Sequence, residues 1–438
     1  MSIINIKQSI GARIIIILAI TLILQIPVQM IISLISEREE RQFEVSNEIT
    51  DKWGSRQNII GPILTLNYKT LITIDKKIET KIEKLYLLPD TLKITGKVKP
   101  EKKKRGIYES VLYNTKLNIE ANFSTMDFNS LEIKNEDIIW ESSKLIIGLS
   151  DMKGIVEISP INWSGQDYFV NPGVEKYNSI SSGVNTKVVV SEKKNNYLCQ
   201  LTLNINGSEN LFFTPLGRLT TVSLSSDWGN PSFTGNFLPT SKKITPNNFS
   251  ADWRISYLSR NYPQSWKNTN YELSNSSFGV CFLLPVDAYQ ETTRTVKYSL
   301  LFIALTFGSF LLIEIFSKKI LHPVQYLLIG AAMVLFYTLL LSISEYSDFA
   351  LSYLISSLSI IILISLYTLS ILKNKLSTLI ISGLLIVLYG LLFIILQLQD
   401  YALLFGSIVL FLFLGLIMFI TRKIDWFNLG KNNSIEKE

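Results

Sequence analysis

The sequence predicts a membrane α-helical protein with six transmembrane helices plus a large β-dominated extracytoplasmic domain of sandwich type. First, 47% of the 438 residues are apolar and only 18% are charged, whereas soluble domains carry about 25% charge. Second, long apolar runs lie near the N-terminus and in the last third of the chain. Third, apolar and polar residues alternate between these runs, as strands with one buried face require.

The first apolar run, from Ile14 to Leu34, is long enough to cross a bilayer and follows Lys7 and Arg13. A cleaved signal peptide is the alternative, but it needs a shorter apolar run and a small-residue cleavage site. We therefore predict an uncleaved transmembrane anchor over residues 1–35. The charged stretch from Glu37 to Trp53 is expected to extend this helix beyond the membrane.

Residues 36–296 form the predicted outer domain. Between Cys199 and Asn206 every second residue is apolar, which is typical of a strand with one buried face. Asn206-Gly207 and Gly229-Asn230-Pro231 supply turn residues. This pattern predicts a β-sandwich with few helices.

Five further helices are predicted in the last third of the chain, over residues 298–316, 324–342, 349–372, 376–396 and 401–420. The joints between them are short, so neighbouring helices must run antiparallel. We expect a five-helix bundle over residues 297–424 and a tail over residues 425–438.

The charges in the joints predict the orientation, because lysine and arginine are retained in the cytoplasm. Positive residues occupy alternate joints and the segment after the last helix: Lys318, Lys319, Lys373, Lys375, Arg422 and Lys423. The other joints carry only acidic residues, namely Glu345, Asp348 and Asp400. This pattern predicts a multi-pass protein with both termini cytoplasmic and residues 36–296 outside.

The sequence offers little material for catalysis. It lacks the common nucleotide-binding, hydrolase and zinc-protease motifs. His322, Cys199 and Cys281 are its only histidine and cysteines, and a zinc site needs about four ligands. We therefore expect no enzyme activity, catalytic residue, metal, cofactor or nucleic-acid partner. The two cysteines either form a disulfide or are separately buried thiols.

Three residues of the helical region are candidates for function. Glu314 lies within an apolar helix, where a carboxylate is costly; it either forms an ion pair with Lys318, one turn away, or relays protons. His322 either starts a helix or responds to pH at the membrane boundary. Glu345 is expected at the outer interface.

Ser352, Ser356 and Ser359 form one small, polar stripe on the predicted helix 349–372. Small residues let membrane helices approach closely, so tight packing is the expected role. A polar translocation path is the alternative.

Several segments, in order along the chain, resemble one family. They are Arg105-Gly106-Ile107-Tyr108, Ser150-Asp151-Met152-Lys153-Gly154, Trp228-Gly229-Asn230-Pro231-Ser232-Phe233, Pro285-Val286-Asp287-Ala288-Tyr289, Leu321-His322-Pro323-Val324-Gln325 and Thr421-Arg422-Lys423-Ile424-Asp425-Trp426. The sequence is similar in these segments to the CreD family of bacterial inner-membrane proteins. Tyr346 departs from the pattern, since many members have histidine there.

The resemblance implies an inner-membrane protein of cell-envelope integrity, with residues 36–296 in the periplasm. It links the family to the Cre two-component response, to tolerance of DNase colicins and to β-lactam responses. It implies no reaction or ligand. Arg105 and Asp287, which lie in matching segments, join Glu314, His322 and Glu345 as candidate functional residues.

We predict a non-enzymatic membrane protein whose partners are the lipid bilayer and, through the outer domain, envelope proteins, lipid or glycan. The alternative is a transporter or lipid-handling protein that uses the helix bundle. A membrane hydrolase is a third, weaker alternative.

Overall fold

The computed structural model describes residues 10–74, 77–124, 128, 131–174, 180–194, 196–267, 271–282, 288–317, 320–398 and 402–422. The chain forms two compact units, described here separately. The helical unit comprises Met1–Arg41 and Val286–Glu438, and the β unit comprises Gln42–Pro285. Helix α1 (Ile10–Trp53) begins in the first and ends in the second, so the predicted extension of the first helix is confirmed.

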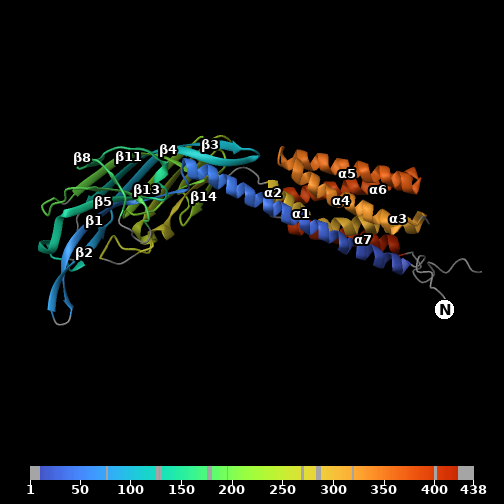
Figure 1. Ribbon diagram of the computed structural model, residues 1–438, viewed down its shortest axis with the longest axis horizontal. Coiled ribbons are helices and arrows are strands. Elements are labelled where there is room, and N and C mark those ends of the chain that lie inside the picture. The colour runs from blue at the N-terminus through green and yellow to red at the C-terminus, as the bar shows by residue number, and fades with distance from the viewer. Residues whose placement is uncertain are drawn as a thin grey trace, which may run out of the picture. The chain divides into compact units, whose positions relative to one another are not determined.

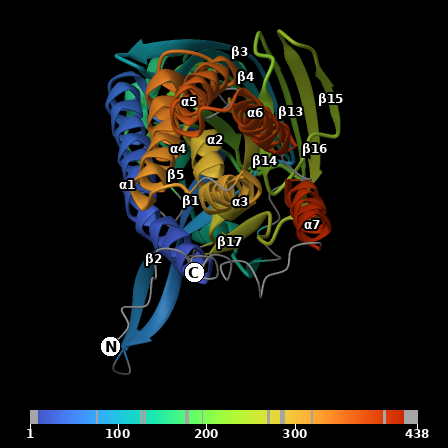
Figure 2. The same ribbon diagram turned by 90° about the vertical axis from the view of Figure 1, so that its right-hand side faces the viewer.

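The helical unit contains six further helices in its described part. They are α2 (Ala288–Lys297), α3 (Ser299–Ser317), α4 (Pro323–Ser344), α5 (Phe349–Leu372), α6 (Lys375–Gln397) and α7 (Ala402–Thr421). Helices α3 to α7 begin and end close to the predicted bounds. Helix α2 was not predicted, because its composition is polar. Helices α4, α5 and α6 pack side by side in sequence order (Figure 2).

The predicted count of six transmembrane helices exceeds the number of candidate spans found within the described residues. Four helices, α1, α4, α5 and α6, are long and apolar enough to cross a membrane. Helices α2 and α3 meet at a bend of 45° and make a fifth candidate only when taken together. Helix α3 has 19 residues, near the lower end of the length that crosses a bilayer. Helix α7, the counterpart of the sixth predicted span, is not among the candidates.

The strands of the β unit form two nine-stranded sheets within the described residues (Figure 1). Sheet A has the order β14 (Pro231–Gly235), β18 (Phe278–Phe282), β12 (Asn210–Phe213), β1 (Gln57–Ile74), β5 (Ile138–Leu149), β10 (Gly183–Lys187), β9 (Asn171–Pro172), with β2 (Lys77–Leu87) on β1 and β17 (Ser265–Lys267) on β2. Sheet B has the order β15 (Ser241–Ile244), β16 (Phe249–Ser256), β13 (Leu219–Ser226), β3 (Thr91–Arg105), β4 (Tyr108–Ser124), β11 (Asn196–Ser208), β7 (Ile161–Trp163), β8 (Gln166–Tyr168), with β6 (Ile155–Ile158) on β11.

Aromatic side chains from the two sheets meet in one hydrophobic core. Trp253 of sheet B contacts Phe278 of sheet A with ring centroids 5.7 Å apart, and Tyr113 of sheet B lies 5.3 Å from Phe282 of sheet A. These contacts, together with the alternation of buried and exposed residues along β16, are those of two sheets packed face to face. The β-dominated character of the domain is thus confirmed, and its sheets contact each other as a sandwich requires.

Candidate functional site

Glu314 is buried in the helical unit with all its contacts supplied by neighbouring elements. Its side chain is only 1% exposed. Oε1 lies 3.4 Å from Nη1 of Arg13 on α1 and accepts a hydrogen bond of 2.7 Å from the backbone N–H of Leu321. Oε2 accepts a hydrogen bond of 3.1 Å from the Tyr326 hydroxyl. The predicted partner, Lys318, lies outside the described residues.

The Tyr326 ring is held in turn by two aromatic side chains of α3. Phe307 and Phe310 lie with ring centroids 5.4 Å and 6.3 Å from it, both edge-to-face. Burial of a carboxylate is costly unless donors and a counter-charge compensate it. Here one cation, one backbone N–H and one hydroxyl do so, and α1, α3 and α4 are joined at a single carboxylate.

His322 begins α4. Its Nδ1 accepts a hydrogen bond of 3.3 Å from the N–H of Val324, and the Gln325 side chain accepts one of 2.9 Å from the N–H of His322. Pro323 occupies the first helical position. Together these contacts form a capping box, so the helix-starting role considered for His322 has a direct structural basis.

Glu345 follows the other end of α4. Its Oε1 accepts a hydrogen bond of 3.2 Å from the Tyr289 hydroxyl on α2 and lies 3.8 Å from Nε of Arg38 on α1. Helix α4 spans roughly 30 Å at 1.5 Å per residue, so Glu345 and Glu314 belong to separate clusters at its two ends.

Of the two candidates taken from the family segments, Arg105 is not part of these clusters. Arg105, at the end of β3, forms an ion pair with Glu48 on the C-terminal part of α1, within the β unit. Asp287 lies outside the described residues.

A polar groove crosses the outer face of sheet B and has a volume of about 350 Å³. Its polar lining consists of Lys93, Thr95, Asn118, Glu120, Ser159, Asn162, Gln200 and Thr202. The register between strands builds it: Glu120 pairs with Lys93 on one side and with Gln200 on the other. Charged and amide side chains from four adjacent strands, β3, β4, β11 and β7, therefore stand in rows.

Hydrogen bonds within the groove link neighbouring strands. Thr202 Oγ1 donates to Asn118 Oδ1 at 3.0 Å, and Gln200 Nε2 donates to Glu120 Oε2 at 3.5 Å. Asn162 Nδ2 donates to Asp167 Oδ1 at 2.7 Å, and the N–H of Thr202 donates to Ser159 Oγ at 2.8 Å. The polar side chains that line the groove are exposed or half-buried. They can exchange hydrogen bonds with a polar ligand lying across the strands.

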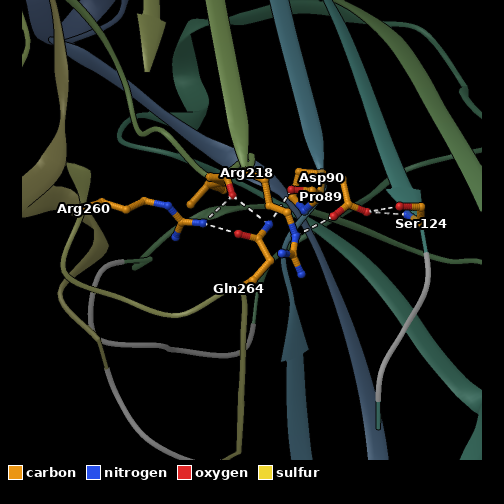
Figure 3. Close-up of polar contacts among 7 residues, drawn as sticks. Pro89, Asp90, Ser124, Arg218, Arg260 and Gln264 are labelled. Atoms are coloured by element: carbon orange, nitrogen blue, oxygen red, sulfur yellow. Dashed lines mark hydrogen bonds and ion pairs between the residues drawn. The ribbon is translucent and has the colours of Figure 1, made fainter. Parts of the chain in front are cut away.

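A second polar cluster of the β unit is closed rather than open (Figure 3). Arg260 Nη2 donates to the carbonyl of Leu216 at 3.0 Å and also to Gln264, whose amide donates to the carbonyl of Pro89. Next to this cluster, Arg218 forms a 2.8 Å ion pair with Asp90. The network ties the chain segments that follow β2, β12 and β16.

Arg260 was missed by sequence reasoning because no motif surrounds it. It is 9% exposed, and its guanidinium lies 4.3 Å from the ring centroid of Tyr262. Burial lowers the pKa of this guanidinium. Carbonyl oxygens and an aromatic face stabilise the buried charge, which indicates a structural role.

Both cysteines are free thiols, so of the two alternatives considered for them the structure has the separate thiols. Cys199 is buried in sheet B, and burial raises the pKa of its thiol to about 12. Cys281 lies in sheet A, with its sulfur 3.1 Å from the Thr234 hydroxyl. Among the described residues, no group of three or more histidine, cysteine, aspartate or glutamate side chains is arranged to hold a metal ion.

Comparisons with known proteins identify similar chains. The family model described as "Inner membrane protein CreD" matches residues 9–427. The inner membrane protein CreD of Escherichia coli (strain K12) is 32% identical over 414 residues, which cover 93% of this chain and 91% of that protein.

Likeness to solved structures is weak. The M1 zinc metallopeptidase from Deinococcus radiodurans is 10% identical, has a TM-score of 0.18 and covers 38% of each chain. Yeast LTA4 hydrolase in complex with bestatin is 8% identical, with a TM-score of 0.19 over 38% of this chain and 26% of that chain. Scores this low carry no argument about fold or function.

Proposed function

The chain belongs to the CreD family of inner membrane proteins, and from that premise we propose a non-enzymatic role in cell-envelope integrity and the response to envelope stress. In this proposal the helical unit is a membrane anchor. The β unit lies in the periplasm and binds an envelope component, for which a glycan is the best candidate.

The polar groove of sheet B is the observation that carries this proposal. A glycan presents hydroxyl groups that both donate and accept hydrogen bonds, and such a ligand needs partners of both kinds. Asn118 and Gln200 supply amides, Glu120 supplies acceptors and Lys93 supplies donors within one groove. Ile119, Pro160 and Leu201 also line the groove, but an apolar lipid chain would leave the charged and amide groups without hydrogen-bond partners, which favours glycan over lipid.

The orientation in this proposal rests on charge. Lys7 precedes α1 and Arg13 lies in its first turn, whereas Lys373 lies in the joint between α5 and α6 and Lys375 begins α6. Positive residues favour the cytoplasmic side. Both termini are therefore cytoplasmic in this proposal, which requires α7, a helix of 20 residues without a charge, to cross as well.

The contacts of Glu314 support an anchor rather than a proton pathway. A relay carboxylate must exchange protons with a next group, whereas this one is already engaged by Arg13, Leu321 and Tyr326. The transporter alternative is favoured by one observation, the buried hydroxyls of Ser356 and Thr368 on α5, which lack a hydrogen-bond partner in the described part of the chain.

Binding to glycan tests the proposal directly. The full chain in detergent is mixed with purified peptidoglycan sacculi and sedimented. The double variant Asn118→Ala, Gln200→Ala removes two partners worth about 1 kcal/mol each, so the affinity for sacculi should fall roughly thirtyfold. Lys116→Ala, an exposed change on β4 outside the groove, is the matched control. Absence of wild-type binding, or equal binding by the double variant, would contradict the proposal.

A further inference from the structure

The distal parts of β1 and β2 form a two-stranded ribbon that projects from sheet A (Figures 1 and 2). The strands remain paired there, from Lys69 with Ile82 to Ile74 with Lys77. Residues 77–82 of β2 are all exposed. An isolated two-stranded ribbon is marginally stable in water, and three or more strands with an apolar face are normally needed.

One face of the ribbon carries exposed apolar side chains. Leu71, Ile78 and Ile82 are 71%, 73% and 60% exposed. Leu71 is paired with Thr80, so all three point to the same side of the ribbon. Exposed apolar side chains gathered in one stripe are a feature of interaction surfaces.

The outer edge of β2 is open along most of its length. Strand β17 pairs only with Leu85, Tyr86 and Leu87. Tyr271, the next described residue after β17, packs against Trp266 of that strand with ring centroids 5.5 Å apart. Within the described residues no strand pairs with the outer edge of residues 77–82. Such an edge is a template for pairing with another strand.

We infer that β2 pairs with β2 of a second copy of this chain, antiparallel and centred on Thr80. In that register Lys77 faces Glu83 of the second copy, and Glu79 faces Lys81 of the second copy. The twofold symmetry repeats each pair, so four opposite-charge pairs form on one face. Lys81 and Glu83 already lie on that face, 3.1 Å apart.

The opposite face gains an apolar contact in the same register. Ile78 faces Ile82 of the second copy, and Leu71 lies beside them on β1. The two ribbons become one four-stranded sheet with six apolar side chains on one side. A sheet of four strands with an apolar face satisfies the condition for independent stability, which the isolated two-stranded ribbon does not.

The charge sequence selects this register over its neighbours. A shift of two residues keeps the isoleucines on the same face but changes the charged pairs. In one direction Lys77 then faces Lys81 and Glu79 faces itself. In the other direction Glu79 faces Glu83 and Lys81 faces itself. Like charges directly opposite each other destabilise a strand pair.

Cysteine cross-linking of the full chain in membranes tests the inference. Thr80→Cys places two thiols across the twofold axis, and facing residues have Cα atoms about 4.5–5.5 Å apart, within disulfide range. Mild oxidation should therefore yield a covalent dimer. Glu101→Cys, on the exposed β3–β4 hairpin, is the matched control and should remain largely monomeric.

Charge reversal in the Thr80→Cys background distinguishes the register. Glu79→Lys alone turns two attractive pairs repulsive and should lower the cross-linked fraction roughly tenfold. Adding Lys81→Glu restores opposite charges and should restore the cross-link. Cross-linking at Thr80→Cys no greater than at Glu101→Cys, or insensitive to the single reversal, would overturn the inference.

Discussion

At the scale of single residues, Asp151 explains one of the family-like segments. Its Oδ2 accepts hydrogen bonds from the N–H and hydroxyl of Ser55, at 2.9 Å and 2.8 Å, and Oδ1 accepts one from the N–H of Lys153. Gly154 is packed so closely that a Cβ would lie 2.3 Å from the carbonyl oxygen of Asn206. The segment thus fixes the chain where α1 ends and β1 begins.

Replacement of Asp151 by asparagine should destabilise the β unit in a pH-dependent way. Burial acts to raise the pKa of Asp151, but the hydrogen bonds from Ser55 and Lys153 outweigh it and lower the pKa below 3.8. Stability from this carboxylate is therefore complete above the unfolded-state pKa and is lost as pH falls through the lower folded-state pKa. We expect a loss of about 1–3 kcal/mol at pH 7 that shrinks below about pH 4.

Unfolding of the full chain in detergent, followed by circular dichroism across this pH range, measures that loss. Glu141→Gln changes an exposed carboxylate of β5 and serves as the control. A loss for Asp151→Asn that stays constant down to pH 2 would refute the proposed contribution of the charge.

Residue partners divide into those that local spacing reveals and those that it cannot. The cap at His322 is formed by Val324 and Gln325, which are close in sequence. Glu314 pairs with Arg13, 301 positions away, and spacing suggested only the residue one turn further on. Arg260 is bound chiefly by backbone carbonyls, which leave no pattern in a sequence.

At the scale of elements, hydropathy located the membrane helices well because each is a long apolar run. Hydropathy did not reveal helix α2, because its ten residues include the charged side chains of Glu291, Arg294 and Lys297. Period-2 alternation predicted strands, but it carries no information on distant partners. The parallel pairs β1 with β12 and β3 with β13 join segments far apart in the chain.

The attachment of α1 to α3 and α4 gives a prediction for Glu314. Glu314→Gln leaves the Arg13 guanidinium without its counter-charge, so the helical unit should lose about 1–3 kcal/mol, less than for a fully buried pair because Arg13 is 18% exposed. Thermal unfolding in detergent reports this loss. The double variant with Arg13→Gln should recover most of it, because no uncompensated charge remains.

The survival of cells under envelope stress distinguishes the anchor proposal from the transporter alternative, with the same Glu314→Gln variant. If the helical unit only anchors the protein, cells carrying Glu314→Gln or Ser356→Leu should survive nearly as well as wild type. Ser359→Ala, an exposed change on α5, is the control. Complete loss of survival at normal protein levels would favour the transporter.

At the scale of the whole molecule, the separation of long apolar runs from the alternating polar region predicted a helical part and a β part. The bend between α2 and α3 did not follow from it, because a bend leaves no mark in hydropathy. The polar groove also went unnoticed in the sequence, because it exists only once register aligns Lys93, Glu120, Gln200 and Asn162 across four strands.

The proposed function depends most on the β unit lying outside the cytoplasm. In a background with Cys199→Ser and Cys281→Ser, single cysteines at Lys243, exposed on β15, and at Lys375, exposed at the start of α6, report the two sides of the membrane. With a membrane-impermeant maleimide on intact spheroplasts, Lys243→Cys should be labelled and Lys375→Cys should react only after lysis. Labelling of Lys375→Cys on intact spheroplasts, with Lys243→Cys protected until lysis, would contradict the account.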